Sequence, residues 1–217
     1  MKAILYTGRW KNASPADREI LSAIFGKERL ATDFPLYFYW FNVVHELGHV
    51  LMRQYAKERI PREAEEQLVT DFAVAYWRAY GEPDKLATLE ELVTRVLPRF
   101  QSPDTDDLGH LAYAAAHWDD RAFFTFNNYG WFQFHCTADA LRRARHLPDV
   151  LAEMGLPGRS LCSLATQVYD LSEPDVAFTV VKETMKRLAC HYQVTFPEQW
   201  EHRMADDPNR HAVLFKI

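Results

Sequence analysis

The sequence contains little cysteine, and the little it has follows no recognisable pattern. The three cysteines, Cys136, Cys162 and Cys190, are widely spaced and form no C-x-x-C pair. An odd number at this spacing favours buried free thiols over a disulfide framework or a cysteine-rich metal site. Free thiols are typical of a reducing compartment, so we expect a cytoplasmic protein.

Signals for secretion, membranes and nucleotides are also missing. Residues 1–10 lack the apolar region and small-residue cleavage site of a signal peptide. The apolar stretch 34–44 is interrupted by Asn42 and followed by polar residues, so it is too short to span a membrane. The net charge of -5, without a long basic block, argues against nucleic acid as a partner. No phosphate loop, dinucleotide fingerprint or serine or cysteine nucleophile pattern is present.

The chain of 217 residues, 48% of them apolar, can bury one sizeable core, which predicts a single domain over residues 1–217. Apolar periodicity predicts a mainly α fold with minor short strands at residues 1–7 and 212–216. The predicted helices lie between Ser14 and Gly26 and over residues 36–57, 62–80, 84–97, 108–118, 129–145, 148–154, 161–171 and 175–191, with one more turn at 198–204. Residues 101–107 and 156–159 are predicted loops, and 121–128 fit either a strand or a helix.

Three helix starts carry recognisable caps. Ser14 precedes a first-turn proline, Thr32 and Asp33 precede Pro35, and Ser172 precedes the last long helix. The helix over 36–57 should be central, because its first half is apolar on every side. No convincing sheet is predicted.

The central helix contains the sequence His45-Glu46-Leu47-Gly48-His49, which reads H-E-x-x-H. Positions i and i+4 of a helix lie on the same face, so both imidazoles can approach one ion. Glu46 can then reach a water bound to that ion without being a ligand. Two imidazoles and a neighbouring carboxylate are the zinc-protease signature. A metal also explains why three polar groups lie in an apolar helix, where they would otherwise be costly to bury.

A hydrolytic zinc site needs a third protein ligand. The metzincin extension H-E-x-x-H-x-x-G-x-x-H is absent, because Met52 and Tyr55 occupy its two further positions. A glutamate on the next helix is the other source. Glu66 shares a helical face with Val69, Thr70, Ala73 and Trp77, and this mostly apolar face should pack on the motif helix. Glu63, Glu65 and Asp71 remain alternatives for the third ligand.

The stretch from Glu66 to Ala73 resembles the E-x-x-A-[DN]-x-x-A pattern of gluzincin-type peptidases, including the group that cleaves phage-type repressors. Glu66 and Ala73 match, whereas Val69 replaces the small residue and Thr70 replaces the Asp or Asn. The resemblance covers about residues 36–80. It implies that His45, His49 and Glu66 bind Zn2+ and that residue 70 orients a ligand histidine, a role for which Asp71 is the alternative.

A hydrolytic site also benefits from a hydrogen-bond donor for the developing oxyanion. Tyr129 and His135 are the candidates, and Asn127 and Asn128 are candidates for holding a substrate backbone. The alternative is a helix start capped by Asn128 and followed by an aromatic core.

Four further histidines, His146, His191, His202 and His211, show no partner spacing. His110 and His117 share a face by their spacing, but such histidines are mostly structural.

These patterns together predict a zinc-dependent metallopeptidase. Its zinc-activated water would attack a peptide bond in a peptide or protein substrate, with Glu46 as general base. The rival interpretation is a non-catalytic zincin-like protein, in which the metal is a structural staple or the fold binds a partner. Solvent access distinguishes them: a water-filled groove that reaches the metal beside Glu46 favours catalysis, and a sealed fourth coordination position favours the staple.

Overall fold

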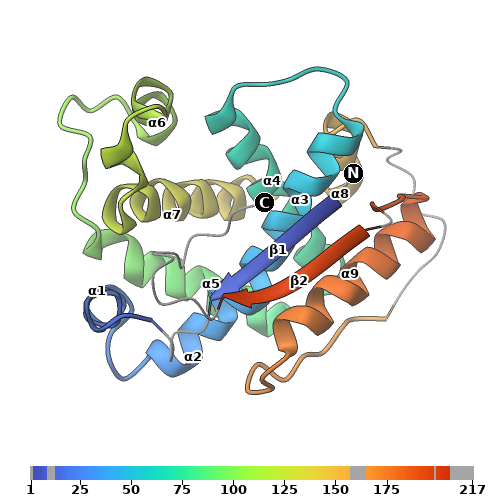
Figure 1. Ribbon diagram of the computed structural model, residues 1–217, viewed down its shortest axis with the longest axis horizontal. Coiled ribbons are helices and arrows are strands. Elements are labelled where there is room, and N and C mark those ends of the chain that lie inside the picture. Colours follow the sequence, from blue (N-terminus) through green and yellow to red (C-terminus); the bar gives the residue numbers. More distant parts are fainter. Residues whose placement is uncertain (1, 9–12, 157–164, 198, 206–217) are drawn as a thin grey trace.

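Helices make up most of the molecule, as the sequence predicts (Figure 1). The computed structural model describes residues 2–8, 13–156, 165–197 and 199–205. The buried apolar side chains among them form one connected core. No helix in the described part of the chain has both the length and the apolar content needed to cross a membrane.

The central helix is longer than predicted and irregular in its first half. It begins with α2 (Leu30–Phe34), continues through the π-helical segment η2 (Pro35–Phe41) and ends with α3 (Asn42–Tyr55). Pro35 lies inside it rather than at its start. Proline has no N–H to donate, and the wider π-helical hydrogen bonding follows directly after it.

The predicted cap at Thr32 and Asp33 is therefore wrong. Asp33 is buried inside the helix, where its carboxylate pairs with Arg95. The carboxylate is thus satisfied by a residue far along the chain, which a local cap pattern does not reveal.

Helix α4 (Arg62–Tyr80) has the predicted bounds and packs along α3. Gly48 allows this close approach: a Cβ atom there would lie 2.8 Å from the Cβ of Val69. Farther along, Trp40 and Trp77 stack with ring centroids 4.1 Å apart. The spacing of the two helices is therefore set by a small residue beside the motif histidines and by an aromatic pair beyond them.

The remaining helices mostly agree with the predictions. They are α1 (Pro15–Phe25), α5 (Pro83–Val96), η3 (Leu97–Arg99), α6 (His110–His117), η4 (Arg121–Phe124), α7 (Phe126–Arg143), α8 (Leu147–Glu153) and α9 (Val176–Tyr192). Ser14 caps α1, as predicted. Asn128 does not cap α7, which begins earlier because the Thr125 side chain accepts from the Asn128 N–H.

The chain after α8 departs most from the predictions. Residues 165–171 are not helical; the Gln167 N–H instead donates to the Tyr80 carbonyl at the end of α4. Ser172 does not cap α9, because its N–H and hydroxyl both donate to Asp170. The predicted loop at 157–159 and the predicted helical residues 161–164 lie outside the described residues.

Residues 199–204 of the predicted helical turn form a strand, and residue 198 lies outside the described residues. Strand β2 (Gln199–Ala205) pairs in parallel with β1 (Lys2–Gly8), with Lys2 opposite Gln199 (Figure 1). This pair lies across the helices, and β1 contacts α3. Within the described residues, the partner of this strand is almost 200 residues away, and such a distant pairing leaves little local signal. The predicted strand at 212–216 lies outside the described residues.

The prediction of buried thiols is correct for one cysteine and wrong for another. Cys136 is buried and free, whereas Cys190 is free but exposed. Cys162 lies outside the described residues. Burial also raises the pKa of Cys136 well above its ordinary value, which keeps that thiol protonated and unreactive.

Candidate metal centre

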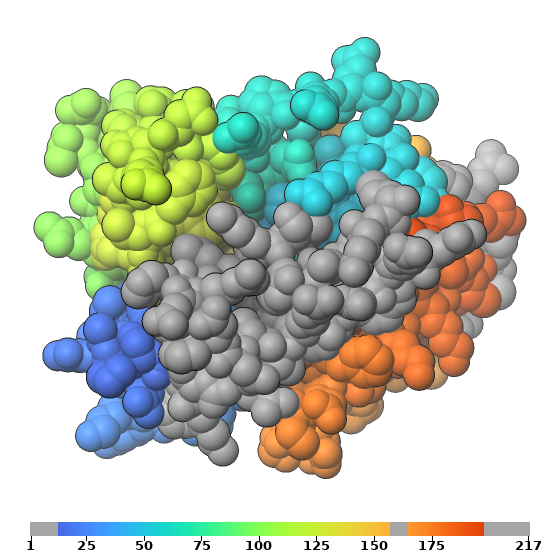
Figure 2. Space-filling view, in the orientation of Figure 1, coloured from blue at the N-terminus to red at the C-terminus, as the bar shows by residue number. Residues whose placement is uncertain are grey.

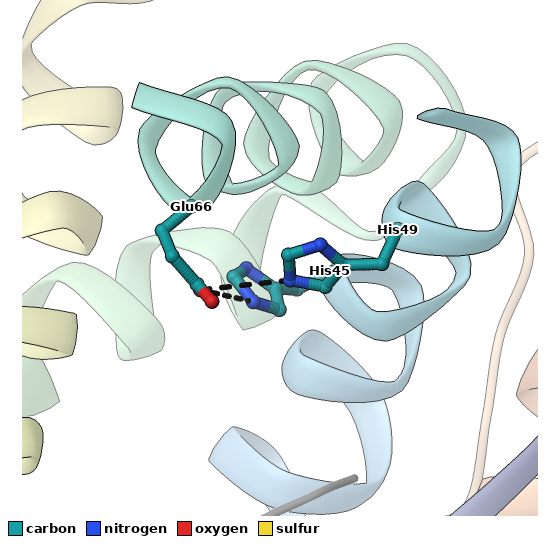
Figure 3. A group of neighbouring side chains, drawn as sticks. All are labelled: His45, His49 and Glu66. Carbon is teal, nitrogen blue, oxygen red and sulfur yellow. Dashed lines mark ion pairs between the residues drawn. The ribbon is translucent and has the colours of Figure 1, made fainter. Parts of the chain in front are cut away.

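Two helices bring three potential ligand atoms to one point (Figure 3). His45 and His49 extend from consecutive turns of α3, and Glu66 comes from the second turn of α4. One ligand atom from each of the three side chains lies within 4.8 Å of the others. The Oε2 atom of Glu66 is 3.3 Å from Nε2 of His45 and 3.5 Å from Nε2 of His49. This grouping is the only one of its kind among the described residues.

These separations suit a tetrahedral cation. Ligand atoms bonded to zinc at about 2.0–2.2 Å in tetrahedral geometry lie roughly 3.4 Å from one another. Charge-assisted N–H···O hydrogen bonds are shorter, about 2.7–2.9 Å. The distances to Glu66 therefore fit three atoms around one ion better than a direct imidazolium–carboxylate bond.

The hydrogen bonds of the two rings leave both Nε2 atoms available as ligands. The Thr70 hydroxyl donates its proton to the Glu66 carbonyl at 2.7 Å, so it can only accept from Nδ1–H of His45, at 3.0 Å. Nδ1–H of His49 donates to Oε1 of Glu65 at 2.8 Å. Acceptors that hold Nδ1–H fix the tautomer and aim the ring, as in known metal sites.

Helix α7 supplies two donors to the Glu66 carboxylate. The Tyr129 hydroxyl donates to Oε1 at 3.1 Å, and the Gln133 amide donates to Oε2 at 2.6 Å. Gln133 also donates to the Tyr129 hydroxyl at 2.9 Å. Gln133 was not among the predicted site residues, although its position four residues after Tyr129 places both on one helical face.

The electrostatics of the centre favour positive charge. Burial alone would lower the pKa of His49, but the carboxylates of Glu66 and Glu65 outweigh it and raise that pKa to about 10. Burial would raise the pKa of Glu66, yet the two histidines hold it well below its ordinary value. Carboxylates that stabilise an extra proton on an imidazole will also stabilise a divalent cation in its place.

Glu46 lies beside the centre without joining the ligand group. It is buried, and Oε1 accepts a hydrogen bond from the Asn42 amide at 3.2 Å. Burial raises its pKa, while His45 and His49 act in the opposite direction. A small cavity of about 50 Å³ is lined by Glu46, Tyr129 and Gln133 together with aromatic rings. This volume is sufficient for water, which needs about 10–15 Å³ per molecule on the same measure.

A larger groove reaches the centre from the other side. It has a volume of about 610 Å³, and His49, Glu65 and Glu66 contribute to its wall. Ligand-binding clefts typically measure about 300–1,000 Å³. The residues that line this groove do not include Glu46, which lines the small cavity instead. The groove therefore opens beside His49 and Glu66, and the space beside Glu46 is the small cavity.

His135, the other predicted donor, does not reach the centre. Its ring lies 5.2 Å from that of His110 and 4.6 Å from that of Trp131, on the α6 side of α7. His117 stacks on Tyr113, with the ring centroids 4.2 Å apart. These three histidines therefore belong to an aromatic cluster away from Glu66.

The remaining candidates also have structural partners. Asp71 pairs with Arg143 and Arg145, so it does not orient a ligand histidine. Asn127 exchanges two hydrogen bonds with the backbone of Gln101, and the Asn128 side chain donates to the Ala122 carbonyl. These two asparagines fasten loops.

Comparison with known proteins adds no relative to this picture. No family model, no curated protein and no solved structure matches the chain. The resemblance to gluzincin-type peptidases therefore depends on the motif residues and their geometry alone.

Proposed function

We propose that this protein is a zinc-dependent peptidase of gluzincin type. The observation that carries the proposal is the convergence of two histidines and a glutamate within 4.8 Å, beside an open groove that His49 and Glu66 line. His45, His49 and Glu66 hold the metal, with two neutral nitrogens and one carboxylate oxygen as donors. This donor set suits zinc, and three protein ligands leave one coordination position open.

When bound, zinc lowers the pKa of water to about 7 and polarises a carbonyl oxygen. Glu46 accepts the proton of the attacking water on its carboxylate and later gives it to the leaving amine. Its raised pKa brings it closer to the neutral range in which a general base works best. Gln133 and the Tyr129 hydroxyl hold the Glu66 carboxylate in place. Tyr129 also lines the small cavity beside Glu46, so it is the better placed of the two predicted donors; its hydroxyl would have to release Glu66 before it could donate to a substrate oxygen.

Two further features are consistent with a peptide substrate in a reducing compartment. The parallel strand pair lies against α3, and the edges of sheets bind extended peptides through backbone hydrogen bonds. Cys136 and Cys190 are both free thiols, so we place the protein in the cytoplasm.

The rival proposal is a metal used as a structural staple. Its support is the depth of the centre: side chains of His45 and Glu66 are only 2% and 10% exposed. The groove beside His49 and the cavity beside Glu46 favour the peptidase, because a staple needs neither a route for substrate nor room for water.

Metal content and hydrolysis, measured together on three variants, test the proposal. Purified protein should hold about one zinc ion per chain by mass spectrometry and cleave an unstructured protein such as casein. His45→Ala should lose both zinc and cleavage, whereas Glu46→Gln should keep zinc and lose cleavage. Glu63→Gln is the matched control: Glu63 lies on α4, three residues before Glu66, but outside the ligand group. This variant should keep both zinc and cleavage.

Equal zinc content in wild type and His45→Ala would overturn the metal assignment. Zinc retained with undiminished cleavage in Glu46→Gln would overturn the catalytic role. A zinc-loaded protein that cleaves nothing in any preparation would favour the structural staple.

A further inference from the structure

The groove that leads to the centre is rich in basic side chains. The twelve residues that line it include the basic side chains of Arg53, Lys57, Arg59 and Arg62 and the carboxylates of Glu58, Glu65 and Glu66. The whole chain has a net charge of -5, so this concentration of positive charge is local.

Most of the acidic groups in this groove are already engaged. Glu65 accepts from His49, and Glu66 lies against both motif histidines and accepts from Tyr129 and Gln133. Glu58 is thus the one carboxylate of the three not engaged by the metal centre, against four Lys and Arg side chains in the same wall.

Two of the basic groups have no partner in the described part of the chain. Lys57 and Arg59 are exposed, and neither forms a hydrogen bond or an ion pair with a described residue. Arg62 pairs with Asp119 at 3.4 Å, but these side chains are 68% and 98% exposed, and such pairs contribute little. Positive charge is thus available to a ligand in the groove.

The two unpaired basic side chains lie on the chain segment that connects the helices carrying the metal ligands. Lys57 and Arg59 belong to the connection between α3 and α4, which runs along the upper edge of the molecule in Figures 1 and 2. This connection joins the helix that carries His49 to the helix that carries Glu66. A substrate that reaches the ligands through the groove therefore passes the unpaired basic side chains.

We propose that the groove binds the part of a peptide substrate that carries a carboxylate close to the cleaved bond. This inference rests on the proposed function. Two unpaired cations in a groove that also contains Glu58 suit one or two carboxylates. A nucleic acid would instead require many phosphate contacts, and the negative charge of the whole protein would repel it. Attraction by exposed cations also implies that salt weakens binding.

The test measures peptide binding directly, so that it does not depend on turnover. Zinc-loaded Glu46→Gln protein is titrated into fluorescein-labelled peptides, and binding is followed by fluorescence anisotropy. One peptide alternates Glu with Ala and has an amidated C-terminus; a second has Lys in place of Glu. An all-alanine peptide, as free acid and as amide, reports on a terminal carboxylate. A single-stranded oligonucleotide represents nucleic acid.

Two charge-reversal variants locate the effect. Lys57→Glu/Arg59→Glu changes the groove, and Lys182→Glu/Lys186→Glu makes the same change in net charge at exposed positions on α9. The Glu peptide should bind roughly tenfold more tightly than the Lys peptide at low salt, since each of two exposed charge pairs changes affinity by about a few-fold. The groove variant should abolish this preference, and the α9 variant should keep it.

Preference for the Glu peptide would show that the groove binds side-chain carboxylates. Preference for the free-acid alanine peptide over its amide would show that it binds the C-terminal carboxylate. Equal affinity for all peptides, equal loss in both double variants, or tighter binding of the oligonucleotide would overturn the inference. Zinc content and casein cleavage of the parent protein separate two failures. A zinc-loaded, active protein without preference overturns this inference alone; a protein without zinc or Glu46-dependent cleavage overturns the proposed function.

Discussion

Helix α7 separates two groups of histidines that differ in almost every respect that matters for metal binding. On one side, His45 and His49 aim Nε2 at the Glu66 carboxylate, while Nδ1 of each ring is held by an acceptor. On the other side, His110 and His135 stack with their ring planes at 16° to each other. The nearest carboxylate to His110, that of Asp139, is 3.8 Å away from Nε2.

The pKa values follow the same division. Carboxylates raise the pKa of His49 to about 10, whereas burial lowers the pKa of both His110 and His135. A pair of nearby histidines therefore does not make a metal site. Convergence of Nε2 atoms, a carboxylate at the shared point and an acceptor behind each ring distinguish the centre from the aromatic cluster.

Removing Glu66 should produce the largest effect. Glu66→Ala should weaken zinc binding by more than about a hundredfold, because even partners behind the ligands usually contribute 10–100-fold. Competition with a zinc-sensitive fluorescent chelator measures this. Glu63→Gln serves as control on the same helix and should bind like wild type; equal affinity of Glu66→Ala and wild type would remove Glu66 from the ligand set.

Removing or weakening the hydrogen-bond acceptors of the two ligand histidines should reduce zinc affinity by an intermediate amount. Thr70→Val keeps the shape of the side chain but removes the acceptor for His45, and Glu65→Gln weakens the acceptor for His49. Each should reduce zinc affinity about 10–100-fold in the same competition assay. Thr184→Val, a buried threonine on α9, is the matched control. If this control lost as much affinity as Thr70→Val, the loss would reflect general destabilisation.

Changing pH should alter both zinc affinity and stability through the protonation of His49. His49 must release its proton before Nε2 can bind metal, so apparent zinc affinity should rise up to about tenfold per pH unit below pH 10. In metal-free protein, the pKa of His49 is raised on folding. Its contribution to stability is therefore fully present below about pH 6.5 and lost as the pH rises to about 10.

Urea unfolding of metal-free protein between pH 6 and pH 10 measures this stability contribution. His49→Gln should remove most of the loss of stability at high pH. A loss of the same size in His49→Gln would assign the effect to other groups.

Adding one methyl group between α3 and α4 should destabilise the fold modestly. In an ordinary helix, Gly→Ala stabilises by up to about 1 kcal/mol. Gly48→Ala should instead cost roughly 1–3 kcal/mol, because the new Cβ would meet Val69 at 2.8 Å. Urea unfolding decides between the two signs, and a stabilised variant would show that the helices can separate freely.

The smallest effect on metal binding should come from the second group of histidines. His110→Ala and His135→Ala should leave zinc content unchanged, since neither ring contacts the centre. Mass spectrometry of both variants checks this. Loss of zinc from either variant, with the fold intact by circular dichroism, would show that the aromatic cluster contributes to zinc binding. The two groups of histidines would then not differ in function.

Local patterns in the sequence were sufficient for most of the helices and for the convergence of the motif residues. The H-E-x-x-H spacing and the apolar face around Glu66 predict two helices packed with their polar residues between them, and the structure has this arrangement. Thr70 also takes the orienting position that the resemblance implies for residue 70.

Features that depend on distant partners were not predictable in the same way. Gln133 and Tyr129 reach Glu66 only because α7 packs on α4, and β2 is a strand only because β1 lies beside it. Pro35 suggested a helix start, but the chain was already helical from Leu30. In each case, the local sequence was compatible with more than one conformation or partner, and contacts with residues far along the chain selected one of them.

X-ray absorption at the zinc edge of the loaded protein tests the central claim most directly, because it reports the atoms around the ion. The spectrum should show two imidazole nitrogens at about 2.0–2.1 Å and oxygen ligands at about 2.0–2.2 Å, with one imidazole lost in His49→Ala. A spectrum with sulfur or only oxygen ligands, or one unchanged in His49→Ala, would contradict a centre built from His45, His49 and Glu66.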